Sequence, residues 1–380
     1  MIQFPIIDLT PSTGVSLISL ETHFAESTPS SFEQMDVEVA RQYIRTVGPN
    51  PKSVANSQKE LYRFLAWCRI EVKKGLQQLN VADLNAYKEF LHNPPPAWIS
   101  RTKWPRNDPR YRPLSGPLSD ASRCQAIIAV KALFSFAEQI GYLKGNTAAL
   151  FRNVSKPARD PTTRYLDANA VALAVETVSR RVPDSEKSRR QRERDHFLLI
   201  AFANTGARLS EIVDANMGAI YPADAGRWWF DIAGDGRRPR RVPVPDNMLE
   251  AFARYREAFG LPRFAERWDS MPLVLASTRR ARERITDEAA SNAIKSIFAE
   301  AAAAATLAGD HGTASTLRLA SAHWLRHGLL IKHASNGVAL KTLQQTAGHA
   351  SITTTAAYLN KADNERHDEI IESMSTEQRD

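Results

Sequence analysis

Residues 316–360 read TLRLASAHWLRHGLLIKHASNGVALKTLQQTAGHASITTTAAYLN, and this stretch decides the fold of the second half of the chain. His323 and Arg326 lie three residues apart in an apolar run. A helix presents residues at this spacing on one face, so an imidazole and a guanidinium group are expected in one pocket. The spacing therefore predicts a site able to bind a phosphate ester.

The same stretch continues into a second helix and a sharp corner. Residues 338–347 have helical periodicity, and Gly348 is typical of a residue that ends a helix in the left-handed conformation. His349 is expected at that corner. Ser351 can cap a short helix over 352–360 that carries Tyr358. A possible nucleophile is thus predicted on a short element near the His/Arg pair.

Length and composition limit the class of protein. The 380 residues are 43% hydrophobic, which is enough for two domains with cores of their own. A formal net charge of +8 favours a polyanionic partner. Two cysteines, Cys68 and Cys124, are too few for a disulfide framework or a zinc site of their own, and they suit a reducing cytoplasm. The first residues lack the pattern of a signal peptide, and no apolar run reaches membrane-spanning length.

The first half of the chain is predicted to be helical after a loosely ordered arm, residues 1–35, which is rich in Ser, Thr and Pro. Helical periodicity then indicates a compact domain over 36–151. Its predicted helices cover residues 37–46, 53–72, 81–91 and 119–139.

A basic, proline-rich insertion, residues 93–118, interrupts this helical domain. It mixes three aromatic residues, Trp98, Trp104 and Tyr111, with five cations, namely Arg101, Lys103, Arg106, Arg110 and Arg112. Such a mixture can follow a phosphate backbone while its rings pack on sugars or bases. It is equally compatible with a solvated loop whose aromatic rings pin it to the helices.

A linker, residues 152–165, and a second domain, residues 166–380, follow. The charged stretch 179–195 is predicted to be a solvated loop and helix start. Residues 226–244 carry the clear β pattern, a hairpin with the basic turn GDGRRP. Further helices are predicted over residues 167–178, 196–204, 207–214, 247–259 and 286–307.

Three segments together resemble the tyrosine recombinases, or phage integrase family. TGARLSEI (205–212) resembles the first arginine box of that family, and HWLRH (323–327) its His-x-x-Arg box. AGHASITTTAAY (347–358) resembles its Gly-His segment, which ends in the nucleophilic tyrosine nine residues after His349. The resemblance covers residues from about 36 to the C-terminus and implies a mainly α fold. A helical, SAM-like core-binding domain would precede a mostly helical catalytic domain with a small β element.

The resemblance also implies a role for each matching residue. Tyr358 would attack a DNA phosphodiester and form a 3′-phosphotyrosyl link, with no metal or cofactor needed. Arg208 and Arg326 would bind the non-bridging oxygens, and His349 would add a hydrogen bond. His323 would accept the tyrosine proton or bind the phosphate, because a phenol with a pKa of ~10 is a poor nucleophile at neutral pH. Glu211 would orient the pocket.

The hairpin departs from the family pattern. Asp235 stands where the family usually has a lysine that protonates the leaving 5′ oxygen. Arg237 or Arg238 is expected to fill this space, although arginine is a poor proton donor. For Arg240 and Arg241 a contact with DNA and a solvated strand edge are both open.

The partners implied by the resemblance are double-stranded DNA with inverted-repeat sites and further copies of the chain. Four protomers would act on two sites, and host DNA-binding proteins could serve as accessory factors. The protein would be cytoplasmic and associated with the nucleoid when bound to DNA. A tail helix over 363–374 would dock on a neighbouring protomer or on its own domain. A mobile-element role is compatible with this reading.

Two other functions fit parts of the sequence. A type IB topoisomerase uses a similar residue set, but it depends on the lysine that is missing here. A DNA-binding accessory or regulatory protein with weakened catalysis would explain Asp235, but not the otherwise complete set of Arg208, His323, Arg326, His349 and Tyr358. Zinc binding by His323 and His327 lacks the glutamate of a metalloprotease helix.

Overall fold

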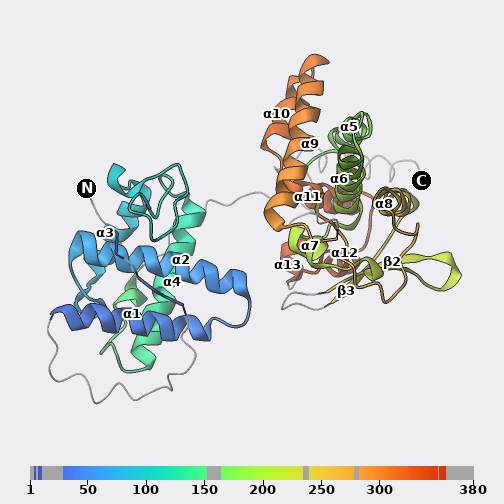
Figure 1. Cartoon of the computed structure of the whole chain (residues 1–380). Coiled ribbons are helices and arrows are strands. Elements are labelled where there is room, and N and C mark those ends of the chain that lie inside the picture. Colours follow the sequence, from blue (N-terminus) through green and yellow to red (C-terminus); the bar gives the residue numbers. More distant parts are fainter. Residues whose placement is uncertain are drawn as a thin grey trace, which may run out of the picture. The chain divides into compact units, whose positions relative to one another are not determined.

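The computed structural model of the protein describes residues 4–5, 7–10, 29–151, 164–233, 239–277, 282–349 and 351–356, with side chains from residue 34 onward in the first helix. The chain divides into two compact units, Met1–Ala158 and Arg159–Asp380 (Figure 1). Both units are mostly helical, and the second also contains a three-stranded sheet. The prediction of a mainly α fold with a small β element is therefore confirmed. No helix in the described ranges is both long enough and apolar enough to cross a bilayer.

The first unit is built on helices that bury one aromatic-rich core. These helices are α1 (Pro29–Thr46), α2 (Pro51–Trp67), α3 (Val81–His92) and α4 (Asp120–Gln139). Asn50 caps α2, because its side chain accepts hydrogen bonds from the amides of Lys52 and Ser53. A π-helical turn, Cys68–Val72, extends α2 and ends at Lys73 in the left-handed region, with φ of 54°. The predicted helix over 53–72 is thus an α-helix with a changed last turn.

Part of the N-terminal segment is packed, which differs from the expected loose arm. Phe4, Ile7 and Leu9 are buried in the core of the first unit. The Phe4 ring meets the edge of Trp98 at 4.7 Å between centroids. Helix α1 also starts before residue 36. The sequence of the arm has no period, so its burial depends on the distant aromatic residues that it meets.

The proline-rich insertion is anchored at both ends of its loop. Trp98 is fully buried, and its indole nitrogen donates to Glu71 Oε1 at 2.6 Å. Ile99 and Leu114 pair through a short parallel bridge. The loop between them is therefore held against the helices by Trp98, which is the pinning role considered from the sequence.

The second unit carries the motif segments on a larger set of elements. Its helices are α5 (Ala168–Ser179), α6 (Glu186–Thr205), α7 (Leu209–Asp214), α8 (Asp246–Ala258), α9 (Asp287–Leu307), α10 (His311–Leu319), α11 (Ala322–Ser335), α12 (Leu340–Ala347) and α13 (Ile352–Ala356). Helix α11 lies close to the start of this unit. A Cβ atom on Gly328 would meet the carbonyl oxygen of Leu166 at 2.3 Å, so only glycine permits this approach.

The sheet of the second unit is antiparallel with the order β1-β2-β3. Its strands are β1 (Ile220–Pro222), β2 (Trp228–Ile232) and β3 (Arg240–Pro243). Strands β2 and β3 form the predicted hairpin, in which Ile232 pairs with Arg240 and Asp231 with Arg241. Because side chains alternate along a strand, Arg240 shares a face with the buried Val242. Strand β1 was not predicted from the sequence.

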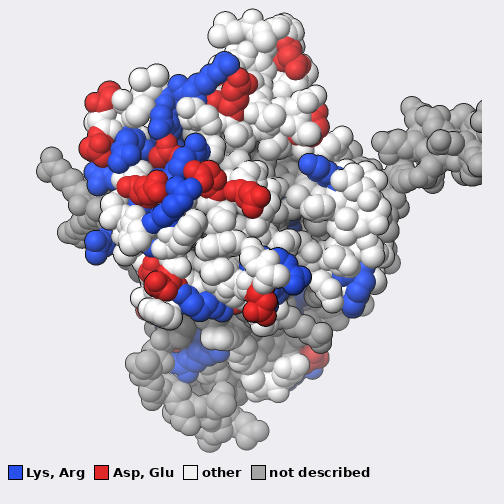
Figure 2. Space-filling model, turned by 90° about the vertical axis from the view of Figure 1, so that its right-hand side faces the viewer, with Lys and Arg blue, Asp and Glu red and all other residues white. Residues whose placement is uncertain are grey.

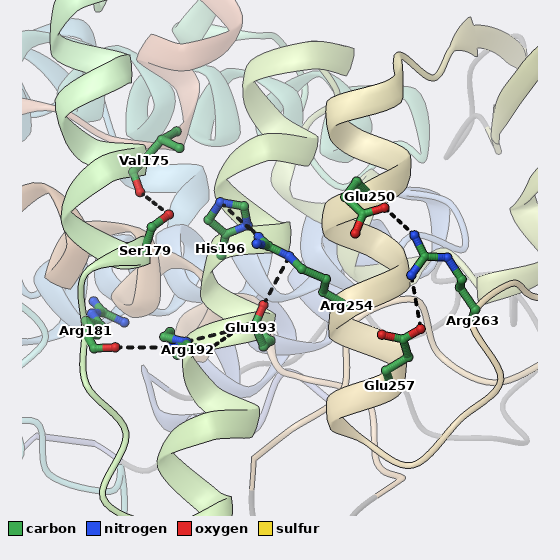
Figure 3. A network of polar contacts seen from close by, with 10 residues as sticks. All are labelled: Val175, Ser179, Arg181, Arg192, Glu193, His196, Glu250, Arg254, Glu257 and Arg263. Carbon is green, nitrogen blue, oxygen red and sulfur yellow. Dashed lines mark hydrogen bonds and ion pairs between the residues drawn. The ribbon is translucent and has the colours of Figure 1, made fainter.

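The charged stretch 179–195 contains the predicted helix start, but more of it is helical than the predicted solvated loop. Helix α6 begins inside it at Glu186, and Ser185 caps it by accepting from the Ser188 amide at 3.2 Å. Glu193 and His196 are buried, and Arg254 of α8 approaches both (Figure 3). Burial, with the charge of Arg254, lowers the pKa of His196 to about 4, so this imidazole is neutral and can accept from Arg254 Nη2 at 3.0 Å. Arg254 is thus bound to side chains of α6.

Candidate functional site

The first arginine box forms a corner between two helices. Helix α6 ends at Thr205, and Gly206 adopts the left-handed conformation with φ of 57°. Arg208 is the N-cap residue of α7, and its amide donates to Glu211 Oε2 at 2.7 Å. Its Nη1 donates to Glu211 Oε1 at 2.9 Å. One carboxylate therefore fixes both the backbone and the side chain of Arg208, whose side chain stays 27% exposed.

Glu211 also binds a second arginine, Arg240 of β3. Arg240 Nη1 donates to Oε1 at 2.9 Å, and Nη2 donates to Oε2 at 2.7 Å. Burial disfavours the ionised carboxyl, but the Arg240 hydrogen bonds, the Arg208 amide and both positive charges lower the pKa of Glu211 to about 2. Glu211 is therefore an anion bound to both Arg208 and Arg240.

Arg326 of α11 connects the first arginine box with the Gly-His corner. Its side chain is fully enclosed, with the residue only 2% exposed. Nη1 donates to the carbonyl of Gly206, and Nη2 donates to the carbonyl of Ala347 at the end of α12. Two segments about 140 residues apart in sequence meet at this guanidinium group. The structure thus brings Arg326 next to the corners that carry Arg208 and His349.

His323 lies one helical turn before Arg326 and is exposed to solvent. Partial burial lowers the pKa of its imidazole, and the charges of Arg326 and Arg208 lower it further. The His327 ring meets that of His323 edge to face, with centroids 4.2 Å apart. Burial, His323 and Arg326 lower the pKa of His327 to about 4. Both imidazoles are therefore neutral at pH 7, and His323 is able to accept a proton.

His349 follows the left-handed Gly348, as predicted, and faces α13. Its Nδ1 lies 2.9 Å from Thr355 Oγ1. Burial lowers the pKa of His349 to about 4, helped by the nearby arginines and His327. When the Thr355 hydroxyl donates to Nδ1, the proton of the neutral ring is on Nε2, which can donate to a phosphate. Thr355 was not predicted from the sequence as a site residue, although its place in the ITTTA helix could have indicated it.

Several predicted site residues lie outside the described residues. They are Tyr358, Asp235, Arg237 and Arg238, and the predicted tail helix 363–374 lies outside them as well. The described part of α13 reaches Ala356, two residues before Tyr358 in the sequence. Among the described residues, no three His, Cys, Asp or Glu side chains are grouped as metal ligands would be.

The two hairpin arginines that the structure describes differ in their surroundings. Arg241 is exposed, and its Nε lies 3.3 Å from Asp231 Oδ1. Arg240 has a side chain only 7% exposed and donates hydrogen bonds inward, to Glu211 and to the carbonyl of Thr346. This placement inside the site differs from both surroundings considered from the sequence, a DNA contact and a solvated edge.

The five cations of the proline-rich insertion fall into two groups. Arg110 binds Asp108 through two nitrogens and lies 3.4 Å above the Trp104 ring, and Arg112 donates to backbone carbonyls. Arg106 lies over the Tyr62 ring. By contrast, Arg101 and Lys103 are exposed and bond to no acceptor within the described part of the chain. They are the cations of this loop with the most freedom to meet a polyanion.

Comparison with known proteins identifies the family. The model of the phage integrase family matches residues 165–365, which is more than half of the chain. The chain belongs to the phage integrase family. The matched range contains both arginine boxes and the Gly-His corner joined by Arg326.

Individual members are similar at low identity. The tyrosine recombinase XerC of Rhodospirillum centenum is 26% identical over 315 residues, which covers 82% of this chain and 78% of XerC. The tyrosine recombinase XerD of Mycobacterium tuberculosis is 26% identical over 241 residues, covering 63% of this chain and 70% of XerD.

Solved structures share the fold of this phage integrase family member. The Tn1549 transposon integrase, solved in complex with transposon right end DNA, has a TM-score of 0.58 at 15% identity and covers 89% of this chain and 98% of its own. The XerH site-specific recombinase, bound to palindromic difH substrate, has a TM-score of 0.57 at 16% identity. The match covers 89% of this chain and 88% of the XerH chain.

Proposed function

We propose that this protein is a site-specific DNA recombinase that breaks and rejoins DNA strands through Tyr358. Its relatives XerC and XerD are named tyrosine recombinases, and its structural neighbours were solved with DNA bound. The observation that carries the proposal is the position of Arg326, which bonds to Gly206 and to Ala347 and so gathers the two arginines and His349. Two guanidinium charges and a neutral imidazole donor gathered around one point suit the charge of a phosphoryl transition state.

In the proposed reaction, the Tyr358 oxygen attacks the phosphorus, and the bond to the 5′ oxygen breaks. A 3′-phosphotyrosyl link forms, and reversal of the step by another 5′-hydroxyl rejoins the DNA without ATP. His323 accepts the tyrosine proton, because its lowered pKa keeps the imidazole neutral. The leaving 5′ oxygen takes its proton from water, since Asp235 replaces the usual lysine and arginine is a poor donor.

The test of this proposal uses nicked duplexes with inverted repeats taken from beside the gene. A nick near the scissile phosphate lets the cleaved fragment diffuse away, so a covalent protein–DNA adduct accumulates. We expect the wild-type chain to form this adduct and Tyr358→Phe to form none. Specific binding without an adduct on any such duplex would instead favour the accessory DNA-binding protein, for which Asp235 is the supporting observation.

The first unit is proposed to bind the DNA backbone, with the catalytic unit acting on the strand. On the face of the molecule shown in Figure 2, Lys and Arg side chains alternate with Asp and Glu. Elsewhere in the contacts of the second unit, Arg263 pairs with Glu250 and Glu257 of α8. Arginines that are paired with carboxylates in this way offer little to a phosphate.

The proposed recombination would join two DNA sites in an assembly of four protomers, with the 363–374 segment as a proposed contact between them.

Arg101 and Lys103 are expected to supply phosphate contacts. Replacing both by alanine should weaken DNA binding and reduce the slope of log K against log salt by roughly 2, since each phosphate contact contributes ~0.9. The matched control is Arg110→Ala, which removes a cation already bound to Asp108. Its slope should stay at the wild-type value. Equal slopes for all three proteins, measured by fluorescence anisotropy at several salt concentrations, would exclude this role.

A further inference from the structure

All three guanidinium nitrogens of Arg240 donate hydrogen bonds within the second unit. Two of its nitrogens bind the two oxygens of Glu211, at 2.9 and 2.7 Å. The third, Nε, donates to the carbonyl of Thr346 at 2.8 Å. A planar fork can satisfy a carboxylate in this way and still use Nε, whereas the single nitrogen of lysine cannot.

The carboxylate of Glu211 accepts four hydrogen bonds, two from Arg208 and two from Arg240. Oε1 accepts from Arg208 Nη1 and Arg240 Nη1, and Oε2 accepts from the Arg208 amide and Arg240 Nη2. A carboxylate has about four acceptor positions, so all of them are occupied. Arg208 is held by Glu211 from one side, and Arg240 holds the same carboxylate from the other. Loss of Arg240 would free Glu211, and with it Arg208, to rotate.

The third bond of Arg240 reaches the corner that carries His349. Thr346 precedes Ala347, whose carbonyl binds Arg326, and His349 comes two residues later. Gly348 packs on the Arg240 side chain so closely that a Cβ atom there would lie 2.9 Å from Nη1. Arg240 thus lies where β3, the first arginine box and the end of α12 meet.

We propose that Arg240 is a positioning residue for cleavage: acting through Glu211, it sets the geometry of Arg208 and ties it to the base of the hairpin. The proposal rests on the proposed function and deepens it. Strand β3 begins at Arg240, so a shift of the hairpin moves Glu211 directly. The proposal also gives Arg240 a different role from its neighbour Arg241, whose side chain lies on the opposite face of β3.

The first test compares the same substitution at these two adjacent positions. Arg240→Lys keeps the charge but loses the fork, while Arg241→Lys changes an exposed side chain on the opposite face of β3. We expect Arg240→Lys to slow single-turnover cleavage of the nicked duplex by about 100-fold, the order of effect of a misplaced catalytic group. Its DNA affinity should match that of the wild type, and Arg241→Lys should cleave at the wild-type rate. Wild-type cleavage by Arg240→Lys, or equal losses in both variants, would overturn the proposal.

A double-mutant cycle with Glu211→Gln tests the path of the effect. If Arg240 acts through Glu211, most of the loss caused by Arg240→Lys should vanish when Glu211 is already glutamine. Additive losses in the cycle would mean that Arg240 acts on the DNA directly, and the proposal would be wrong.

A third measurement needs no DNA and separates this proposal from the proposed function. Hydrogen exchange of the free protein, followed by mass spectrometry, should be faster in peptides 205–213 and 340–349 for Arg240→Lys, and unchanged for Arg241→Lys. Unchanged exchange in both variants would overturn the positioning role even if the wild type cleaves DNA. If the wild type forms no adduct, but Arg240→Lys exchanges faster in these peptides and Arg241→Lys does not, the recombinase proposal would be wrong and the positioning role would stand.

Discussion

Replacing Arg326 by lysine is expected to reduce strand cleavage by about 10³-fold, since a positioned donor to developing charge contributes up to this much. The same change should lower the free energy of unfolding by ~2 to 3 kcal/mol, the order of a buried hydrogen bond to a charged group. The reason is geometric. The two terminal nitrogens of Arg326 bind the carbonyls of Gly206 and Ala347, and a single ammonium group cannot reach both. One buried carbonyl would lose its partner, and the two corners would separate.

The measurements for Arg326→Lys are single-turnover cleavage of the nicked duplex and thermal unfolding of the free protein. Arg318→Lys is the control, because Arg318 is exposed on the preceding helix and donates to Thr306 Oγ1 at 2.8 Å. It should leave both quantities unchanged. A cleavage rate within tenfold of the wild type for Arg326→Lys would show that this guanidinium group does not serve the transition state.

Several helix ends were predictable from local sequence, although the starts of α1 and α6 and the whole of α10 were not. The predicted range 119–139 agrees with α4 (Asp120–Gln139), for which Ser119 is the N-cap residue. The left-handed conformation at Gly348 was predicted as well. Such features depend on residues within one or two turns, because caps and periodicity act locally. Local rules failed at Phe4, whose burial depends on Trp98 in a loop almost a hundred residues away.

The motif residues were found from the sequence, but their connections were not. Arg240 and Arg241 are the same residue type side by side, and only the face of β3 decides which one meets Glu211. The buried Val242, two residues after Arg240, was a usable signal for that face. Nothing local indicated that Arg326 would bind Gly206, since that contact spans 120 residues. Hydrogen bonds between distant segments depend on the packing of the whole unit.

Replacing Gly348 by alanine is expected to slow cleavage by about 100-fold, because the substitution displaces groups that hold the catalytic geometry. Gly348 has φ of 62°, and an added Cβ atom would lie 2.9 Å from Arg240 Nη1 and 3.1 Å from its Cδ and Cζ. The Arg240 side chain cannot yield easily, since Nη1 is bound to Glu211. The new methyl group would therefore push on the carboxylate that orients Arg208, and on the corner that carries His349.

Gly337→Ala separates this effect from backbone strain alone. Gly337 also has a positive φ, 74°, but a Cβ atom there would meet nothing within 4 Å. Both variants should lose ~1 to 2 kcal/mol of unfolding free energy from the left-handed conformation. Only Gly348→Ala should also lose cleavage when both are assayed well below their unfolding temperatures. If the two glycine variants cleave the nicked duplex at the same rate, the contact between Gly348 and Arg240 has no part in positioning Arg208, because strain is the property that they share.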